Sequence, residues 1–200
     1  SGMKMSGGAK PFGIDEENIE ALIKSLPTEQ LNLRGFHIFS GSQNLNEAAI
    51  IDCQKQTFAL AKQLIELSQK VLNIELDYIN IGGGFGIPYF PGETSINLDL
   101  ISDNLNKLNN KYSKTLNGTE LIIELGRFIV GESGVYVSKI IDIKQSHDKT
   151  YLVCDGGMHH HLANSGNFGQ VIRKNYPVKI ANKFDSEFKQ EVEIVGPLCT

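Results

Sequence analysis

The stretch that decides the fold is Leu76-Asp77-Tyr78-Ile79-Asn80-Ile81-Gly82-Gly83-Gly84-Phe85-Gly86, a strand-like run that leads directly into a cluster of glycines. Bare backbone at a strand end lets N–H groups approach an anion without a Cβ in the way, and α/β proteins hold phosphates in such concavities. Glycine clusters also form plain structural turns. The stretch alone therefore leaves an anion site and a structural turn open.

Two common nucleotide-binding patterns do not fit this glycine run. A dinucleotide fingerprint needs glycines at i, i+2 and i+5, but Ile87 stands at the third position when Gly82 and Gly84 fill the first two. The chain also contains no Gly-Lys pair, which a P-loop requires.

Helices and strands alternate around the glycine run. Apolar patterning predicts strands over residues 33–40, 76–81 and 120–124, with a short helix capped by Asp15 before Pro27 and longer helices over 47–72 and 98–112. Short apolar strands separated by helices indicate a parallel sheet covered on both faces. The first part of the chain is thus predicted to be a doubly wound sheet or part of a (β/α) barrel.

The pattern changes after Arg127. Apolar and polar residues alternate from Val135 to Ile143, and further apolar runs at 151–154 and 192–195 follow without long helices between them. This pattern predicts antiparallel strands. We therefore place a boundary near residue 130, with an α/β part over 1–130 and the beginning of a β domain over 131–200.

Composition limits the class of protein. The chain has 200 residues, 40% of them hydrophobic, and a formal net charge of −4, which fits a soluble globular chain without a basic surface for nucleic acid. No apolar run approaches the roughly 18 residues of a membrane span. Three cysteines without a C-x-x-C pair favour a reducing compartment, so a cytoplasmic location is expected.

Polar residues follow three of the predicted strands, at 37–43, 82–86 and 124–127. In a parallel barrel the carboxyl ends of the strands meet on one face, where active sites are built. Glu124-Leu125-Gly126-Arg127 places an acid and a base around a glycine at such an end, which favours a functional site over a structural ion pair.

These motifs, in this order and approximate spacing, resemble the fold-III pyridoxal-phosphate decarboxylases, the group of diaminopimelate, ornithine and arginine decarboxylases. The matching segments are Phe36-His37-Ile38-Phe39-Ser40-Gly41-Ser42-Gln43, Gly82 to Gly86, Glu124 to Arg127, Asp155-Gly156-Gly157-Met158 and Gly196-Pro197-Leu198-Cys199. The resemblance covers almost the whole chain. It implies the C-terminal half of an alanine-racemase-like (β/α)8 barrel, followed by the start of an antiparallel β domain.

The resemblance also implies pyridoxal 5'-phosphate as cofactor and gives roles to individual residues. Glu124 would pair with the pyridine nitrogen, and His37 would stack on the ring. Arg127 would bind the cofactor phosphate or a substrate carboxylate. Cys199 would donate a proton during catalysis, across the interface of a homodimer with shared active sites. The phosphate would be held by Ser42, Gly82, Gly83, Gly84 and Gly126.

The substrate is indicated by a departure from the diaminopimelate enzymes. Where those carry Arg-Pro and a tyrosine, this chain has His159-His160-His161, and we expect His159 and His160 to face the substrate. Three consecutive histidines on a strand would alternate between its faces and could not converge on one metal, so we expect a loop that faces the cofactor or substrate there and no metal site. The closest resemblance is to a subgroup with glutamyl-carrier-protein and exosortase-associated decarboxylases, which implies an amino acid attached to an acyl or peptidyl carrier protein. A free amino acid, as in diaminopimelate or ornithine decarboxylases, is the alternative.

Two family residues fall outside this chain by the resemblance, namely the Schiff-base lysine and a second cofactor-binding tyrosine. The chain is therefore expected to be an internal segment that is inactive alone. A competing class is a barrel protein that binds pyridoxal phosphate without turnover, or an alanine-racemase-like enzyme with a tyrosine base. The predicted β strands after residue 130 and the Gly-Pro-x-Cys motif weigh against both.

Overall fold

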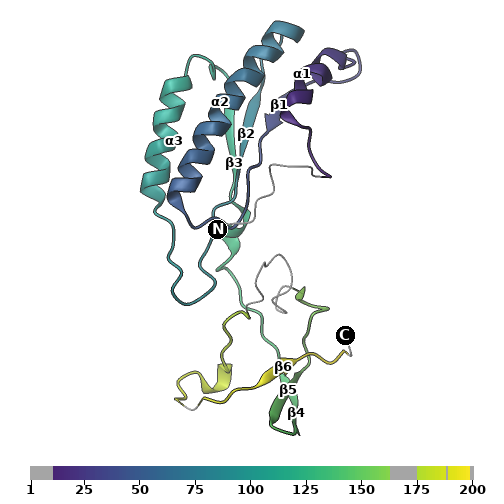
Figure 1. The fold of residues 1–200 in the computed structure, drawn as a ribbon, viewed down its shortest axis with the longest axis vertical. Helices are drawn as coiled ribbons and strands as arrows, with labels where there is room; N and C mark the ends of the chain where they lie inside the picture. Colours follow the sequence, from purple (N-terminus) through teal and green to yellow (C-terminus); the bar gives the residue numbers. More distant parts are fainter. Residues whose placement is uncertain (1–10, 163–174, 188, 199–200) are drawn as a thin grey trace. The chain divides into compact units, whose positions relative to one another are not determined.

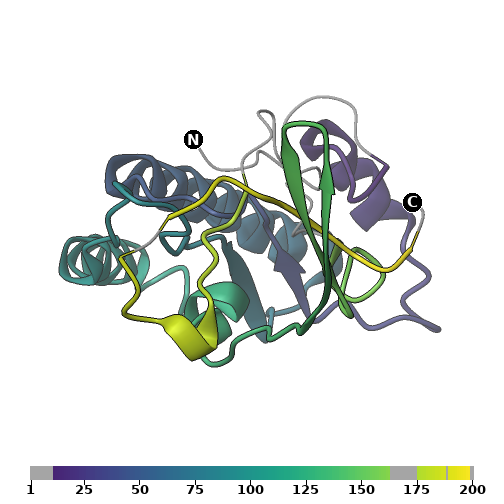
Figure 2. The same ribbon diagram turned by 90° about the horizontal axis from the view of Figure 1, so that it is seen from below.

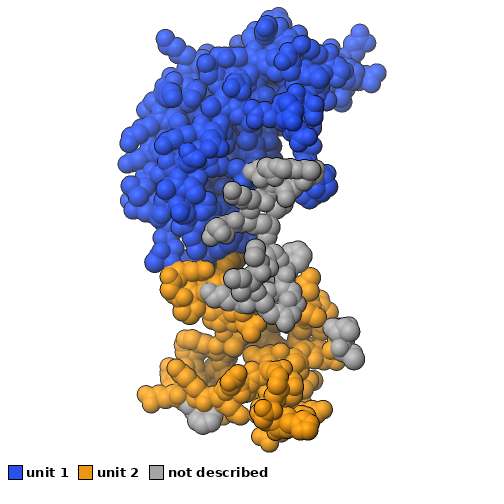
Figure 3. Space-filling view, in the orientation of Figure 1, with its two compact units in different colours: residues 1–88, 94–133 blue, residues 89–93, 134–200 orange. Residues whose placement is uncertain are grey.

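The structure is a computed structural model that describes residues 11–162, 175–187 and 189–198. The chain divides into two compact units (Figure 3). The first comprises residues 1–88 and 94–133, and the second comprises 89–93 and 134–200. The division after residue 133 lies close to the boundary expected near 130, and the assignment of 1–130 and 131–200 as domains stays a prediction.

Helices and strands alternate in the first unit (Figure 1). In chain order they are α1 (Glu16–Ser25), β1 (Gly35–His37), α2 (Glu47–Leu72), β2 (Tyr78–Gly83), α3 (Leu98–Tyr112), β3 (Glu120–Glu124) and α4 (Gly126–Val130). The sheet has the order β1-β2-β3, and both pairs of strands are parallel. The α/β class, the parallel sheet and the bounds of α2, α3 and β3 agree with the sequence. The strand expected over 33–40 is shorter, and β2 extends into the glycine run.

Side-chain caps fix where the two long helices begin. The Asn46 side chain accepts a hydrogen bond from the Ala49 N–H (3.0 Å), and Asn97 caps α3 in the same way. Asp15 was expected to cap α1, but its side chain makes no capping hydrogen bond. The Asp15 backbone carbonyl accepts from the Asn18 N–H instead (2.9 Å), so backbone bonding alone starts that helix.

The core lies on one face of the sheet. Phe36, Ile79 and Leu121 are in register across the three strands and pack in one cluster with Phe58 of α2 and Leu108 of α3. Because alternate residues of a strand point to opposite faces, the next row falls on the other face. That row is His37, Asn80 and Ile122. The expected helix cover on both faces is thus not seen among the described residues, where α2 and α3 share one face.

The second unit holds a separate sheet with the order β4-β5-β6. Its strands are β4 (Ile140–Ser146), β5 (Lys149–Cys154) and β6 (Glu193–Val195), and a short 3-10 helix, η2 (Ala181–Lys183), precedes β6. Figure 2 shows β4 and β5 as a hairpin, which is antiparallel as expected. The expectation is wrong for β6, which pairs in parallel with β5. The long connection between them allows the chain to cross over before it pairs, which parallel pairing needs.

Among the described residues, none of the helices combines the length and the apolar character needed to cross a membrane.

Candidate functional site

Three segments of the first unit come close together at the glycine run. Gly82 and Gly84 have φ angles of 70° and 81°, a region that favours glycine. A Cβ on Gly83 would lie 1.6 Å from the carbonyl oxygen of Glu124, and one on Gly84 would lie 2.3 Å from that of Gly41. The structure therefore adds a packing reason to the one expected from the sequence: these glycines let β3 and the loop after β1 approach the end of β2.

Gln43 fastens these segments to one another. Its side-chain amide donates to the Ile87 carbonyl (2.6 Å) and accepts from the Ile87 N–H (3.3 Å). The same side-chain oxygen accepts from Nη1 of Arg127 (3.0 Å). Beside it, the Asn44 N–H donates to the Gly84 carbonyl (2.9 Å). The loop after β1, the glycine run and the start of α4 are thus held in one arrangement.

The strand ends enclose an open pocket of about 180 Å³. Its lining consists of Phe39, Ser42, Gln43, Gly84, Phe85, Glu124, Leu125, Gly126 and Arg127. Five residues with a predicted cofactor role are among them: Ser42, Gly84, Glu124, Gly126 and Arg127. Gly82 and Gly83 lie at the end of β2, just before this lining, and His37 ends β1. Segments that are far apart in the sequence therefore meet at one carboxyl edge of the sheet.

The Glu124 carboxylate is held on the sheet face opposite the core. One oxygen, Oε1, accepts a hydrogen bond from Nδ2 of Asn80 (2.7 Å), and Oε2 lies 3.5 Å from Nε2 of His37. The Glu124 side chain is 54% exposed, whereas Asn80 is buried. The His37 ring also meets Phe39 edge to face. An anchored carboxylate open to the pocket can pair with a cationic ring nitrogen, and the nearby Arg127 guanidinium can pair with an anion.

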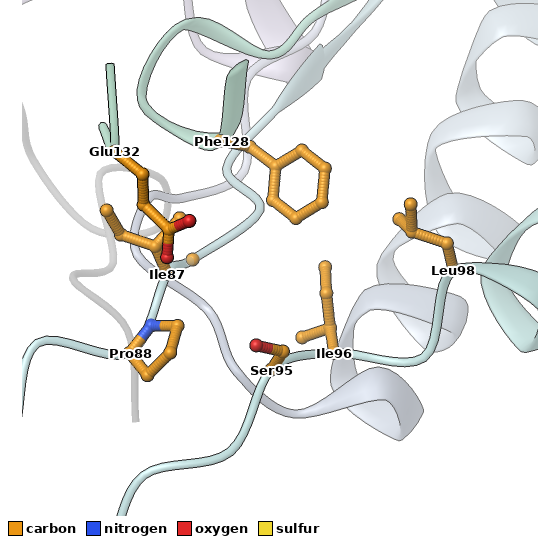
Figure 4. Close-up of a pocket in the computed structure, with 8 residues that line it drawn as sticks. Ile87, Pro88, Ser95, Ile96, Leu98, Phe128 and Glu132 are labelled. Atoms are coloured by element: carbon orange, nitrogen blue, oxygen red, sulfur yellow. The ribbon is translucent and has the colours of Figure 1, made fainter. Parts of the chain in front are cut away.

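A second pocket of about 190 Å³ lies elsewhere in the first unit (Figure 4). In Figure 4 the side chains of Phe128, Ile96 and Leu98 surround it, with Glu132 and Ser95 at its margin. None of the residues with a predicted cofactor role lines it. We therefore take the pocket beside Glu124 as the candidate site.

In the second unit, the two family-like motifs meet at the ends of β5 and β6. The Asp155 carboxylate accepts from the Lys139 N–H (2.8 Å) and the Ser138 hydroxyl (2.9 Å). The Lys139 backbone bond first, and the Ser138 bond second, lower the pKa of the Asp155 carboxyl below its ordinary value. Gly157 approaches Gly196 so closely that a Cβ on Gly157 would lie 3.0 Å from the Gly196 Cα.

The histidine run begins in a turn, which agrees with the loop expected there. The N–H groups of His160 and His161 both donate to the Gly157 carbonyl (2.9 and 3.2 Å), which folds the run back on itself. The rings of His159 and His160 lie with centroids 3.9 Å apart. Their contact with substrate stays a prediction, and Cys199 lies outside the described residues.

Sequence reasoning missed two residues of this site. Asn80 is a polar residue in an otherwise apolar strand, two positions before the glycines, and that contrast is a usable signal. Gln43 belongs to a quoted motif, but nothing in the sequence shows that its amide reaches the backbone of Ile87.

Comparisons with known proteins show the family to which the chain belongs. Residues 2–131 match the family described as "Pyridoxal-dependent decarboxylase, pyridoxal binding domain". The chain is 34% identical over 99% of its length to an L-glutamyl-[BtrI acyl-carrier protein] decarboxylase of Niallia circulans, covering 46% of that protein. It is 30% identical over 94% of its length to a diaminopimelate decarboxylase of Archaeoglobus fulgidus, covering 42% of it.

A solved structure gives the same result. The crystal structure of diaminopimelate decarboxylase from Helicobacter pylori complexed with L-lysine aligns with a TM-score of 0.70 and 27% identity, over 94% of this chain and 43% of that one. The chain belongs to the pyridoxal-dependent decarboxylase family, whose cofactor is pyridoxal phosphate. It spans less than half the length of these relatives.

Proposed function

We propose that this chain is the part of an amino-acid decarboxylase that holds the phosphate and the ring nitrogen of pyridoxal 5'-phosphate. The observation that carries the proposal is the gathering of Ser42, Gly84, Gly126 and Arg127 in one pocket with the Glu124 carboxylate. These groups offer a hydroxyl, exposed backbone and a guanidinium to an anion, and a carboxylate to a cation, as this cofactor requires. Membership of the family supports the same assignment.

We further propose that the first unit is the C-terminal half of a (β/α)8 barrel and that the second begins a β domain. Helices packed on a single sheet face support the barrel, because the other face of a barrel strand points into its interior. In such a barrel His37, Asn80 and Glu124 point inward from the carboxyl end of the strands.

We assign the residues to two ends of the pocket, one for the phosphate of the cofactor and one for its ring. At one end, the Ser42 hydroxyl, the glycine backbone and Arg127 bind the phosphate. At the other, Glu124 accepts a hydrogen bond from the ring nitrogen and keeps that nitrogen protonated, while His37 lies against the ring. When bound, pyridoxal phosphate supplies an electron sink for the carbanion left by loss of CO₂. Across a homodimer interface, the Cys199 thiol would supply the proton that replaces the departed CO₂ on the substrate carbon.

The proposed substrate is an amino acid carried as a glutamyl-type thioester on a carrier protein. The similarity to the glutamyl acyl-carrier-protein decarboxylase supports it, and His159 and His160 are the proposed contacts. Free diaminopimelate is the second candidate, favoured by the similarity to diaminopimelate decarboxylases. We place the enzyme in the cytoplasm.

The test is decarboxylation by the complete polypeptide that carries this segment, loaded with pyridoxal phosphate and given carrier-bound glutamate or free amino acids. Glu124→Gln should lower CO₂ release by about a hundredfold, because a neutral amide no longer holds the ring nitrogen protonated. Glu120→Gln, at the start of the same strand, should not. Full activity of Glu124→Gln, or no decarboxylation by the wild-type protein, would contradict the proposal.

A further inference from the structure

We propose that Asn80 is a positioning residue that sets the distance between Glu124, which is assigned to the ring nitrogen, and the glycine run, which is assigned to the phosphate. Its side chain bonds to both at once. Nδ2 donates to Oε1 of Glu124 (2.7 Å), and Oδ1 accepts from the Gly82 N–H (2.9 Å). This inference rests on the proposed function, since the two groups it joins are the ones assigned to the two ends of the cofactor.

The position of Asn80 in the sheet makes this bridge rigid. It lies on β2, the central strand, in register with His37 on one side and Ile122 on the other. Its own carbonyl accepts from the Ile38 N–H (2.8 Å), so the backbone is fixed as well. Asn80 is only 8% exposed. A buried amide with a partner at each end has one favourable orientation. If the amide were flipped, its oxygen would face the Glu124 oxygen and its NH₂ group would face the Gly82 N–H.

The chemistry of an amide suits this place. Glu124 is half-exposed and would otherwise be free to change rotamer, so a bond to one oxygen fixes the direction of the other, which faces His37. A lysine or arginine could make the same bond, but its charge would neutralise the carboxylate that must pair with a cation. A neutral donor orients Glu124 and leaves its negative charge available.

Asn80→Asp separates this role from simple packing. The substitution keeps the acceptor for the Gly82 N–H and replaces only the donor to Glu124. Above neutral pH the two carboxylates repel each other and Glu124 turns away. At lower pH such a pair can share one proton, which restores the hydrogen bond. We expect the affinity for pyridoxal phosphate to be close to wild type near pH 5 and about tenfold weaker near pH 8.

Asn104→Asp is the matched control. Asn104 donates through Nδ2 to Oε1 of Gln54, also at 2.7 Å, between α3 and α2 and away from the pocket. The affinity of Asn104→Asp for pyridoxal phosphate, divided by that of the wild-type protein, should not change with pH. In the double variant Asn80→Asp/Glu124→Gln, the new amide donates to the new carboxylate, so the dependence on pH should disappear although overall affinity is reduced.

A second measurement leaves Asn80 unchanged, in case Asn80→Asp does not fold. In the cofactor-free protein, Glu124→Ala should speed hydrogen exchange at the Asn80 side-chain amide by about tenfold, and Glu120→Ala should not change it.

The outcomes separate the two claims. A pH-independent affinity ratio for Asn80→Asp, equal to that of Asn104→Asp, would overturn the positioning role and leave the proposed function standing. Unchanged exchange at the Asn80 amide in Glu124→Ala would overturn it too. If the wild-type protein does not bind pyridoxal phosphate, the proposed function fails and this inference fails with it.

Discussion

Gly83→Ala should damage the site from within the backbone. The added Cβ would lie 1.6 Å from the Glu124 carbonyl oxygen, and real Cβ atoms essentially never approach another heavy atom closer than 3.0 Å. The two groups must therefore separate by at least 1.4 Å (3.0 − 1.6). Both belong to the main chain, so no change of rotamer relieves the contact.

The cost follows from that displacement. A shift of this size lengthens a hydrogen bond of about 2.9 Å well past its usual range, so pairing between β2 and β3 is lost at this end. Overpacking of about 1–3 kcal/mol and one lost bond of about 1 kcal/mol give a destabilisation of about 2–4 kcal/mol. Glu124 moves with its backbone, so cofactor affinity should fall by about tenfold or more.

The assay is denaturant unfolding together with titration of pyridoxal phosphate into the complete protein. Gly118→Ala is the control, because a Cβ added there would meet no atom within 4 Å, although Gly118, unlike Gly83, has a positive φ (80°). It should cost about 1–2 kcal/mol of backbone strain and leave cofactor affinity unchanged. Wild-type stability and affinity in Gly83→Ala would refute the close approach of β2 and β3.

Two further predictions concern charged side chains. In a titration, Arg127→Met should lower the affinity for pyridoxal phosphate by about tenfold and leave the affinity for pyridoxal, which lacks the phosphate, unchanged. If the affinity for pyridoxal phosphate is also unchanged, Arg127 is assigned to the substrate carboxylate instead. Because the Lys139 and Ser138 bonds lower the pKa of Asp155, its contribution to stability is complete above the ordinary value of 3.8 and is lost as the pH falls through the lowered value. Acid unfolding of Asp155→Asn should lack that part of the pH dependence, and an unchanged acid profile would contradict the argument.

The regular part of the fold was predictable because it depends on local patterns. The bounds of α2 and α3 follow from helical spacing, with Asn46 and Asn97 as caps, and β3 follows from a short apolar run. Strand direction in the second unit was not predictable in the same way. Alternation in 192–195 indicates a strand, but it carries no information on whether β6 runs with or against β5. That choice depends on the path of the connection between them.

In the candidate site, too, some residues were predictable from local patterns and others were not. The gathering of Ser42, Gly84, Glu124 and Arg127 was predictable because they lie at or just after strand ends in recognisable motifs, and parallel strands bring such ends to one edge. Asn80 ends no strand, and its importance comes from register. It reaches Glu124 because β2 and β3 pair so that Asn80 lies opposite Ile122, two residues before Glu124 and on the same sheet face. A shift of one residue would turn Asn80 toward the core, where its amide could no longer reach Glu124. The register of β2 and β3 therefore places Asn80 beside Glu124, a contact that neither strand reveals alone.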